Sequence, residues 1–507
     1  MRLGFAGFGT LALVAALSGC DNKVQQEGTP SVRRSASRTQ PGSTTSTAAT
    51  KEDTFMLGVA GPFTGNSSEF GVQIRMGVEL FADELNATGG INGRKLKLNI
   101  QDDAGNAAQA QTVASTIASN DAVLAVIGHF NSSCSLNGKP IYTQAKMVMF
   151  SPGSTNVEVT KNSEYAYRNI FTDDFQGQSL AQYAGNVLSF KNMAILFDND
   201  DYGAGLKDSF KKKAQELGIK IVAEQAYNKE QPDFRSQLTT VHGAQPQPEA
   251  ILVAGLYNEA ANIARQARDI GIKAQFIGGD GVFSQQYITL AGAAAEGAYV
   301  TCPFLFDLGG EKAGRFDVGF RKKYHREPDA WAALSYDAIS VVCEGIKRNG
   351  FTRDAVLQYL KGLDSPQTAY DSLTGKTFFD QEGDCKKPVQ VAQVKNGKFV
   401  AAANQLGPDG KAVAVRLADE SASAENSTMT SATVSVTPAA PPGETSQAAP
   451  VPTPAPEPVS TAPTPAAAAN TPPSAAPTAT ASPTPQETAG PRPADVLTSA
   501  PAAANPQ

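Results

Sequence analysis

Histidine and cysteine are scarce in this chain of 507 residues, which narrows the chemistry that it can perform. Only three histidines occur, His129, His242 and His325, and the serines that follow His129 form no Gly-x-Ser-x-Gly elbow. A hydrolase needs a nucleophile, a base and an orienting group at one site. The five cysteines form neither a CxxC pair nor a Cys/His spacing typical of a metal site. We therefore expect a protein that is not an enzyme and that has no cofactor or bound metal.

Positive charge is not in excess either, and large apolar residues are sparse at both ends of the chain. Lysine and arginine number 43 against 49 acidic residues, a net charge of −6, which argues against a nucleic-acid partner. Residues 20–52 are rich in Ser, Thr, Gln and Gly, and residues 403–507 become mostly Ala, Pro, Thr and Ser. Such segments cannot bury enough apolar surface to offset their ordering entropy. We predict a flexible linker in the first segment and a disordered tail in the second.

The first twenty residues carry a short apolar run that ends in Leu17-Ser18-Gly19-Cys20. The run is too short to span a bilayer as a stable helix and predicts a signal peptide over residues 1–19. Small residues directly before Cys20 resemble the lipobox of bacterial lipoproteins, which implies that acyl chains on Cys20 tether the protein to a membrane. Asp21 resembles the inner-membrane retention signal of some Gram-negative lipoproteins. We expect the periplasmic side of the cell envelope, with the inner membrane favoured over the outer. An ordinary signal peptide with a stray cysteine is the alternative.

Four cysteines remain once Cys20 is set aside, namely Cys134, Cys302, Cys343 and Cys385. An oxidising compartment permits disulfides among them. Four thiols allow three pairings, and the sequence does not choose among them.

About 350 residues between the two polar ends carry nearly all the aromatic residues and most of the periodic pattern. Apolar runs at 55–60, 122–127 and 147–150 predict buried strands, and the residues between them show helical spacing of apolar side chains. The same alternation recurs between residues 193 and 278. Apolar strands that alternate with amphipathic helices indicate parallel sheets covered on both faces. The length exceeds what one core usually supports, so we predict an α/β fold of two doubly wound parallel-sheet lobes with a cleft between them.

Polar residues follow several of the predicted strands, where ligands bind in open α/β sheets. Ser132 and Ser133 open a helix after one strand, and Ser154-Thr155 follow the next. Free N–H groups and hydroxyls at such positions suit a carboxylate, although a plain N-cap also explains a serine there. Asp280 lies between glycines, either as a turn residue or as a carboxylate presented to an ammonium. Together these residues predict a cleft for a zwitterion.

A series of short motifs also runs through this region: Gly61-Pro62-Phe63-Thr64-Gly65, Asn86-Ala87-Thr88-Gly89-Gly90-Ile91-Asn92-Gly93, Ile127-Gly128-His129, Ser151-Pro152, Asp201-Tyr202-Gly203-Ala204-Gly205, Arg265-Gln266-Ala267-Arg268-Asp269-Ile270-Gly271 and Ala295-Glu296-Gly297. With these motifs, the segment from Phe55 to about Val400 resembles the type I periplasmic solute-binding proteins of the leucine/isoleucine/valine class. The resemblance implies three crossings between lobes, near residues 172, 302 and 375. The expected first lobe is 53–172 plus 303–375, and the expected second lobe is 173–302 plus 376–402.

The resemblance also implies which residues contact the ligand. They are Phe70, Asn131, Ser132, Gly153, Ser154, Thr155, Tyr202, Leu256, Tyr257, Asp280 and Trp331. Ser132 takes the place of the family's carboxylate-binding serine, and Asp280 that of a glutamate that pairs with the ligand's ammonium. Leu256 stands where the family has a tyrosine, with Tyr257 beside it. Trp331 lies near the region that lines the side-chain pocket, where core packing is an alternative role.

The function that follows is capture, with no chemistry performed on the ligand. We expect a membrane-tethered substrate-binding protein that takes up an amino acid, of the branched-chain class or related, and delivers it to the permease subunits of an ABC importer. An amide, urea or aromatic acid, bound for transport or sensing, is the alternative ligand. Closure of the lobes around the ligand is expected, because only the closed form makes all of the ligand's contacts.

Overall fold

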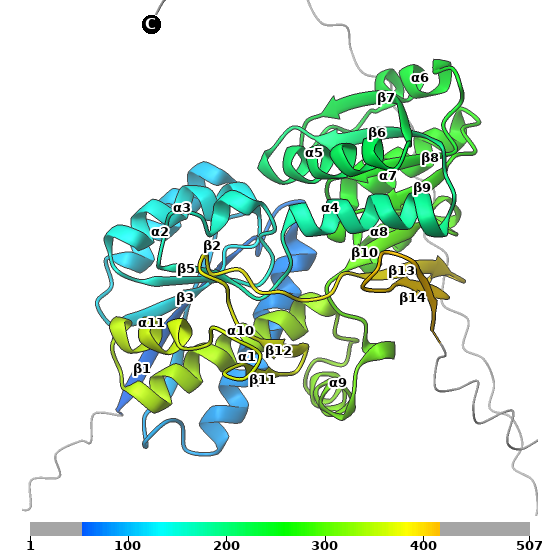
Figure 1. Cartoon of the computed structure of the whole chain (residues 1–507). Helices are drawn as coiled ribbons and strands as arrows, with labels where there is room; N and C mark the ends of the chain where they lie inside the picture. Colours follow the sequence, from blue (N-terminus) through cyan, green and yellow to red (C-terminus); the bar gives the residue numbers. More distant parts are fainter. Residues whose placement is uncertain (1–52, 416–507) are drawn as a thin grey trace, which may run out of the picture. The chain divides into compact units, whose positions relative to one another are not determined.

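The computed structural model describes residues 53–415, which form the α/β fold of two lobes that the sequence predicts (Figure 1). The expected signal peptide, Cys20, Asp21 and the tail beyond residue 415 lie outside the described residues. Each lobe has one sheet at its centre, and helices cover both faces of that sheet.

The sheet of the first lobe is entirely parallel, with the strand order β2-β1-β3-β4-β5. Its strands are β1 (Thr54–Gly61), β2 (Lys95–Asp102), β3 (Val123–Ile127), β4 (Val148–Ser151) and β5 (Ala166–Arg168). The helices of this lobe are α1 (Ser68–Ala87), α2 (Ala107–Ala118), α3 (Ser132–Gln144), α9 (Glu311–Tyr324), α10 (Ala330–Asn349) and α11 (Arg353–Lys361), with a 3₁₀ turn η1 (Val157–Val159). In the register, Val59 of β1 lies opposite Ile100 on one side and Ile127 on the other. Every residue of β3 and β4 is buried, because helices cover both faces of this sheet.

The sheet of the second lobe has the order β14-β13-β10-β9-β8-β6-β7 and is parallel except at one edge. Its strands are β6 (Asn192–Asp198), β7 (Lys220–Tyr227), β8 (Ala250–Ala254), β9 (Gln275–Gly278), β10 (Tyr299–Cys302), β13 (Gln390–Lys395) and β14 (Lys398–Ala401). Its helices are α4 (Asp173–Gln182), α5 (Asp201–Glu216), α6 (Arg235–Gly243), α7 (Tyr257–Asp269) and α8 (Gln285–Ala291), with short turns η2 (Tyr183–Val187), η3 (Asp280–Val282), η4 (Gly292–Ala295) and η5 (Phe306–Leu308). The pair β13 and β14 is an antiparallel hairpin that joins the sheet through β10. The last two strands of this lobe, β13 and β14, therefore form an antiparallel edge.

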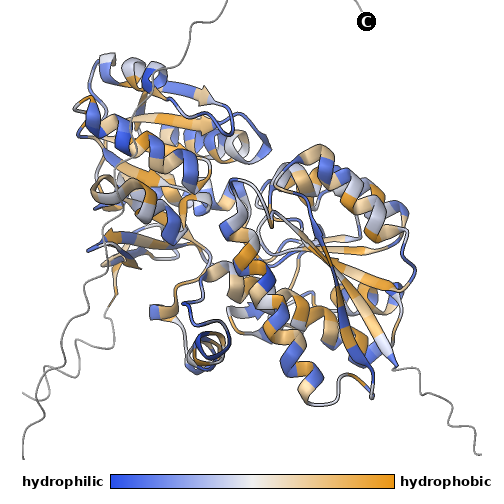
Figure 2. Ribbon diagram, turned by 180° about the vertical axis from the view of Figure 1, so that it is seen from behind, coloured by the Kyte–Doolittle hydropathy of each residue, from blue (hydrophilic) through white to orange (hydrophobic). Residues whose placement is uncertain are grey.

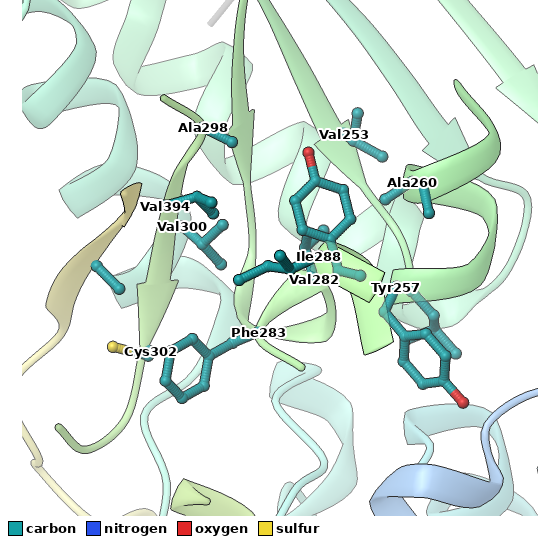
Figure 3. Packing of buried hydrophobic residues seen from close by; sticks show 14 of the residues in the cluster. Val253, Tyr257, Ala260, Val282, Phe283, Ile288, Ala298, Val300, Cys302 and Val394 are labelled. Carbon is teal, nitrogen blue, oxygen red and sulfur yellow. The ribbon is translucent and has the colours of Figure 1, made fainter. Parts of the chain in front are cut away.

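Burial follows the hydropathy of the elements. Apolar residues concentrate on the strands of both sheets, whereas the helices mix apolar and polar faces (Figure 2). In the second lobe, Val253 of β8, Val300 of β10 and Val394 of β13 meet side chains from α7 and α8 in one cluster (Figure 3). The helix α7 shows why: Ala260, Ile263, Ala264 and Ala267 recur at helical spacing and are all buried.

The third crossing between the lobes lies later in the chain than the expected position near residue 375. The hairpin of β11 (Tyr370–Ser372) and β12 (Gly375–Thr377) is held to α10, because Leu373 N and Thr374 N donate to the Asp337 carboxylate at 2.7 and 2.8 Å. Asp384 then pairs with Arg168 of β5 at 2.6 Å. The chain joins the second sheet only at Gln390, so the assignment of residues 376–389 to the second lobe is corrected.

The second lobe also extends beyond residue 402, where the tail was expected to begin. A hairpin of β15 (Asn404–Leu406) and β16 (Ala412–Ala414) packs on η2. Tyr183 donates its hydroxyl proton to Asn404 O at 3.0 Å, and Asn186 Nδ2 donates to Gly410 O at 2.9 Å. These bonds give order to a polar segment that has few apolar side chains to bury.

The cysteines of the described residues are all unpaired and buried. Cys134 and Cys343 lie in α3 and α10, and Cys302 and Cys385 lie elsewhere in the two lobes. None of the three pairings that the sequence allowed is formed between them.

Candidate functional site

A small cavity lies between the lobes at the carboxyl ends of the parallel strands. Its lining comes from the segments after β3, β4, β6, β8 and β9, and consists of Phe130, Asn131, Ser132, Gly153, Asp200, Tyr202, Leu256, Asp280 and Gly281. This is the position at which open α/β sheets bind ligands. The cavity has room for about one water molecule, about 10 Å³, so the lobes must part before a solute enters.

The first lobe presents hydrogen-bond donors to this cavity. Asn131 is the residue before α3, and its side chain makes no capping bond, so the first N–H groups of the helix remain available. Ser132 follows, and its Oγ accepts a bond from Asn156 N at 3.2 Å, which leaves the hydroxyl proton free to donate. The buried hydroxyl of Thr155 lies near this wall but does not line the cavity. A carboxylate is the group that such a set of donors binds best.

Ser154 belongs to the support of the site and does not line the cavity. Its Oγ donates to Phe130 O at 2.8 Å, and its N–H donates to Ser151 Oγ at 2.9 Å. Arg168 Nη1 donates to Ser154 O at 2.9 Å from beneath. These bonds hold the loop after β4 against the loop after β3. The Ser154 hydroxyl therefore stabilises the loops and does not bind a ligand.

An aromatic group closes the cavity on the side where a ligand side chain is expected. The ring of Phe130 stacks on Phe70 at 4.5 Å between centroids and meets the edge of Trp331 at 5.0 Å. A Cβ placed on Gly153 would lie 2.3 Å from Phe130 Cδ2, so only glycine leaves space for this ring. Trp331 is fully buried and donates its Nε1–H to Phe283 O at 3.1 Å. Phe70 and Trp331 therefore stand behind Phe130 and do not touch the cavity.

Tyr257 joins this aromatic group from the second lobe. Its ring meets Phe70 edge-on at 5.0 Å, and Figure 3 shows it turned away from the core of its own lobe. The aromatic contact thus crosses between α1 and α7.

The second lobe presents a carboxylate. Asp280 is buried after β9, and its Oδ1 accepts the hydroxyl proton of Tyr202 at 2.7 Å. Gly281 N donates to the same Tyr202 oxygen at 3.0 Å. Burial raises the pKa of Asp280 to about 6 and raises the pKa of Tyr202 well above its usual value. Near neutral pH the Tyr202 hydroxyl therefore keeps its proton and points it at Asp280.

Contacts across the cleft hold the lobes together around the cavity. Ser133 Oγ donates to Asp201 Oδ2 at 2.6 Å, and Asn156 Nδ2 donates to Asp201 O at 2.7 Å. Asn258 Nδ2 donates to Asn66 O at 3.3 Å from another part of the second lobe. The described form is therefore a closed one.

Six of the residues that the resemblance implied line the cavity, namely Asn131, Ser132, Gly153, Tyr202, Leu256 and Asp280. Phe70, Ser154, Thr155, Tyr257 and Trp331 do not line it. The contacts described above hold Phe70, Ser154, Tyr257 and Trp331 in the surrounding structure. Sequence reasoning missed Phe130, Asp200 and Gly281. Each is the direct neighbour of a predicted site residue or motif, and that adjacency is the signal that was available.

His129 is a structural residue of the first lobe. It is fully buried, with Nδ1 2.6 Å from Asp103 Oδ2 and Nε2 3.1 Å from the Tyr142 hydroxyl. Within residues 53–415 no cluster of three or more His, Cys, Asp or Glu side chains is arranged to hold a metal. Over the same residues no helix combines the length and the apolar character needed to cross a bilayer.

Comparison with known proteins places the chain in a family. Residues 54–398 match the family described as periplasmic binding protein. The chain is a type I periplasmic binding protein of the Leu/Ile/Val-binding class. The family consists of solute-binding proteins that catalyse no reaction, which confirms the expected fold class and the expected lack of enzymatic activity.

The relatives of this periplasmic binding protein align with most of their own length. It is 32% identical over 338 residues to the amino acid binding protein of Pseudomonas aeruginosa, a match that covers 65% of this chain and 87% of that protein. It is 33% identical over 341 residues to Leu/Ile/Val-binding protein homolog 1 of Brucella suis, covering 66% and 89%. The solved structure of the branched-chain amino acid transporter substrate binding protein LivJ of Streptococcus pneumoniae, in complex with isoleucine, matches with a TM-score of 0.65 and 29% identity, covering 72% of this chain and 100% of that one.

Proposed function

We propose that this periplasmic binding protein captures a branched-chain or related neutral amino acid and delivers it to an ABC importer. The observation that supports the proposal most directly is the pairing of opposite chemistries across one cavity. Donors at the start of α3 face a carboxylate, Asp280, from the other lobe. The relatives from Brucella suis and Streptococcus pneumoniae are named for binding, or were solved with, amino acids of this class.

The ligand's two charged ends account for the two walls. Its carboxylate accepts bonds from the Ser132 hydroxyl and from the first N–H groups of α3, where the helix dipole also favours an anion. Its ammonium pairs with the carboxylate of Asp280. A ligand without an ammonium would leave that carboxylate without a cationic partner. An aromatic acid is for that reason a poorer fit, since the buried carboxylate would lose solvation and gain no partner.

The side chain of the ligand meets Leu256 and the ring of Phe130, both of which line the cavity. Each buried methylene contributes about 0.8 kcal/mol, so the affinity is expected to increase with the number of side-chain methylenes that fit between these two residues. Closure over the bound solute then presents one form of the protein to the permease subunits.

The proposal includes a membrane tether at Cys20, on the periplasmic side and at the inner membrane. It is supported by Leu17-Ser18-Gly19-Cys20 and Asp21 in the sequence, which lie outside the described residues. A tether holds the protein near an inner-membrane importer and so raises the effective concentration at which the two meet. Fractionation that recovers the mature protein in the outer membrane contradicts this part of the proposal.

Binding is tested by thermal denaturation of the purified protein with each L-amino acid and with acetamide, urea and benzoate. A ligand at about a hundred times its Kd stabilises the folded protein by about 2.7 kcal/mol, so a true ligand stands out. Calorimetry with Asp280→Asn is expected to show affinity about ten- to a hundredfold lower, because a bond to a charged group is worth about 1.5–3 kcal/mol. Asp269→Asn, at an exposed residue of α7, serves as the control and leaves affinity unchanged. Unchanged affinity in Asp280→Asn removes the amino-acid proposal.

A further inference from the structure

Asn131 is a buried polar residue of the cavity whose side-chain oxygen the protein leaves unused. The residue lines the cavity, is 6% exposed and stands directly before α3. Within residues 53–415 its Oδ1 has no hydrogen-bond partner. Unsatisfied buried polar atoms are rare in folded proteins, and each is costly. Such an atom on the wall of a binding cavity therefore needs an explanation.

An asparagine at the start of a helix or 3₁₀ turn normally caps it, and two others in the first lobe do so. Asn106 Oδ1 accepts bonds from two N–H groups of α2, each at 3.0 Å, and Asn156 Oδ1 accepts one from Glu158 N at 2.9 Å. Asn131 makes no capping bond, although it has the same place at α3. Neither of the two capping asparagines lines the cavity, whereas the one that does not cap is part of its wall.

The neighbours of Asn131 explain why its oxygen stays unpaired. Its Oδ1 lies beside Gly105 in the loop after β2, where an added Cβ would be 3.2 Å away, so this neighbour has no side chain to offer. Asp200 is the other polar side chain of the cavity that the ligand's two charged ends do not use. Its carboxylate is already engaged, because it pairs with Lys229 at 2.7 Å and accepts a bond from Gly203 N at 2.8 Å. The Asn131 amide is therefore the polar group of this wall that remains for a ligand's side chain.

We propose that Asn131 selects the side chain of the ligand, and that the solute is a neutral amino acid whose short side chain carries a hydroxyl or an amide. This inference rests on the proposed function, because it takes the zwitterion to be held by Ser132 and Asp280. The hydrocarbon part of the side chain contacts Phe130 and Leu256, and its polar end bonds the Asn131 amide. A hydroxyl or an amide both donates and accepts, so it can bond Asn131 whichever way that amide is turned.

The selection follows from the cost of leaving Asn131 without a partner. When the lobes are apart, solvent forms hydrogen bonds with the amide. A solute with an apolar side chain closes the cavity over the amide and supplies no partner, which lowers affinity by about five- to 150-fold. An apolar pocket discriminates poorly against an added hydroxyl, whereas a site that bonds the hydroxyl strongly rejects the analogue that lacks it.

The experiment compares amino acids of the same shape by calorimetry on the whole protein. L-threonine has a hydroxyl where L-valine has a methyl group, and L-asparagine has an amide where L-leucine has a branched apolar end. In the pair that binds, the polar member is expected to bind at least about tenfold more tightly than the apolar one. In Asn131→Leu, which offers no hydrogen bond, this ratio is expected to fall to about one or to invert. Asn137→Leu makes the same change at an exposed residue of α3 and is expected to keep the ratio of the unchanged protein.

A second measurement needs no ligand and tests for a structural role of Asn131. Leucine at this position leaves no side-chain polar atom without a partner, so the urea midpoint of the empty Asn131→Leu protein is expected to equal or exceed that of the unchanged protein. Asn106→Leu removes an asparagine that caps α2 and is expected to lower the midpoint.

The outcomes separate this inference from the proposed function. Selection by Asn131 is overturned, and amino-acid capture still stands, if the apolar member binds as tightly or more tightly in both pairs or if the ratio is unchanged in Asn131→Leu. The same holds if Asn131→Leu loses as much urea midpoint as Asn106→Leu, or if another amino acid binds and neither pair does. Failure of every amino acid to bind removes both proposals.

Discussion

Neutralising Asp384 is expected to destabilise the first lobe strongly, because its partner is a fully buried arginine. The guanidinium of Arg168 is 0% exposed and lies 2.6 Å from the Asp384 carboxylate. It also donates to Ser154 O and to Thr160 Oγ1, each at 2.9 Å, and Thr160 in turn donates to Asp384 at 2.7 Å. Burial lowers the pKa of Arg168, and within residues 53–415 no other carboxylate forms an ion pair with it, although the charges of Asp173 and Asp380 also act on it. Breaking a buried pair on one side costs about 3–5 kcal/mol.

The assay is urea unfolding of Asp384→Asn, followed by far-ultraviolet circular dichroism, with the free energy of unfolding extrapolated to water. Glu311→Gln is the matched control, since it breaks a pair with Arg315 in which both side chains are more than half exposed. Its free energy of unfolding is expected to equal that of the unchanged protein within error, as for most exposed pairs. The double variant Arg168→Met with Asp384→Leu is expected to regain most of the loss, because it leaves no unpaired charge behind.

A loss below about 1 kcal/mol in Asp384→Asn refutes the reasoning, since it means that water reaches the Arg168 guanidinium when its partner is gone. The same result would remove the argument that residues after β12 belong to the first lobe, which depends on this pair.

Two further predictions concern the cavity and its closure. Phe130→Leu removes the ring that covers Gly153 and enlarges the space for the ligand's side chain. Calorimetry is expected to show that the affinity for leucine increases relative to that for alanine by about fourfold for each methylene newly buried. An unchanged ratio of the two affinities contradicts the placement of the ligand's side chain against Phe130. Asp201→Ala removes the carboxylate that accepts the hydrogen bond from Ser133 across the cleft. Stopped-flow measurement is expected to show a ligand dissociation rate about two- to tenfold higher, with little change in the association rate. A change confined to the association rate would show that this bond does not stabilise the closed form.

Local pattern was enough to predict most of the strands and helices that surround the site. The apolar runs at 55–60, 122–127 and 147–150 appear as β1, β3 and β4, because a strand buried on both faces must be apolar throughout. The helix α10 escaped prediction for a related reason. Most of its residues are buried, so it lacks the polar face that gives a surface helix its period.

In the candidate site, too, local pattern predicted some features of the residues but not which of them contact a ligand. Ser132 and Ser154 both follow a strand, and both are short hydroxyl residues next to a helix or turn. Ser132 lines the cavity and its hydroxyl proton is free to bind a ligand, whereas the Ser154 hydroxyl donates to Phe130 O. Trp331 was expected to line the side-chain pocket or to pack in the core, and its bond to Phe283 O places it in the core. These outcomes depend on contacts between residues far apart in the chain, which neither composition nor spacing encodes.

Periodicity of burial and turn chemistry are local properties, so the α/β class, the pairing of two lobes and the strand ends where polar residues gather can all be inferred from the sequence. The packed fold is needed to know which of those polar residues face the cavity, where the chain crosses for the last time, and that Asp280 is buried against the Tyr202 hydroxyl. Burial and hydrogen-bond satisfaction depend on neighbours that come from distant parts of the chain. A carboxyl group such as that of Asp280 is an ordinary acid in the sequence, and it becomes a site for a cation when packing removes it from water.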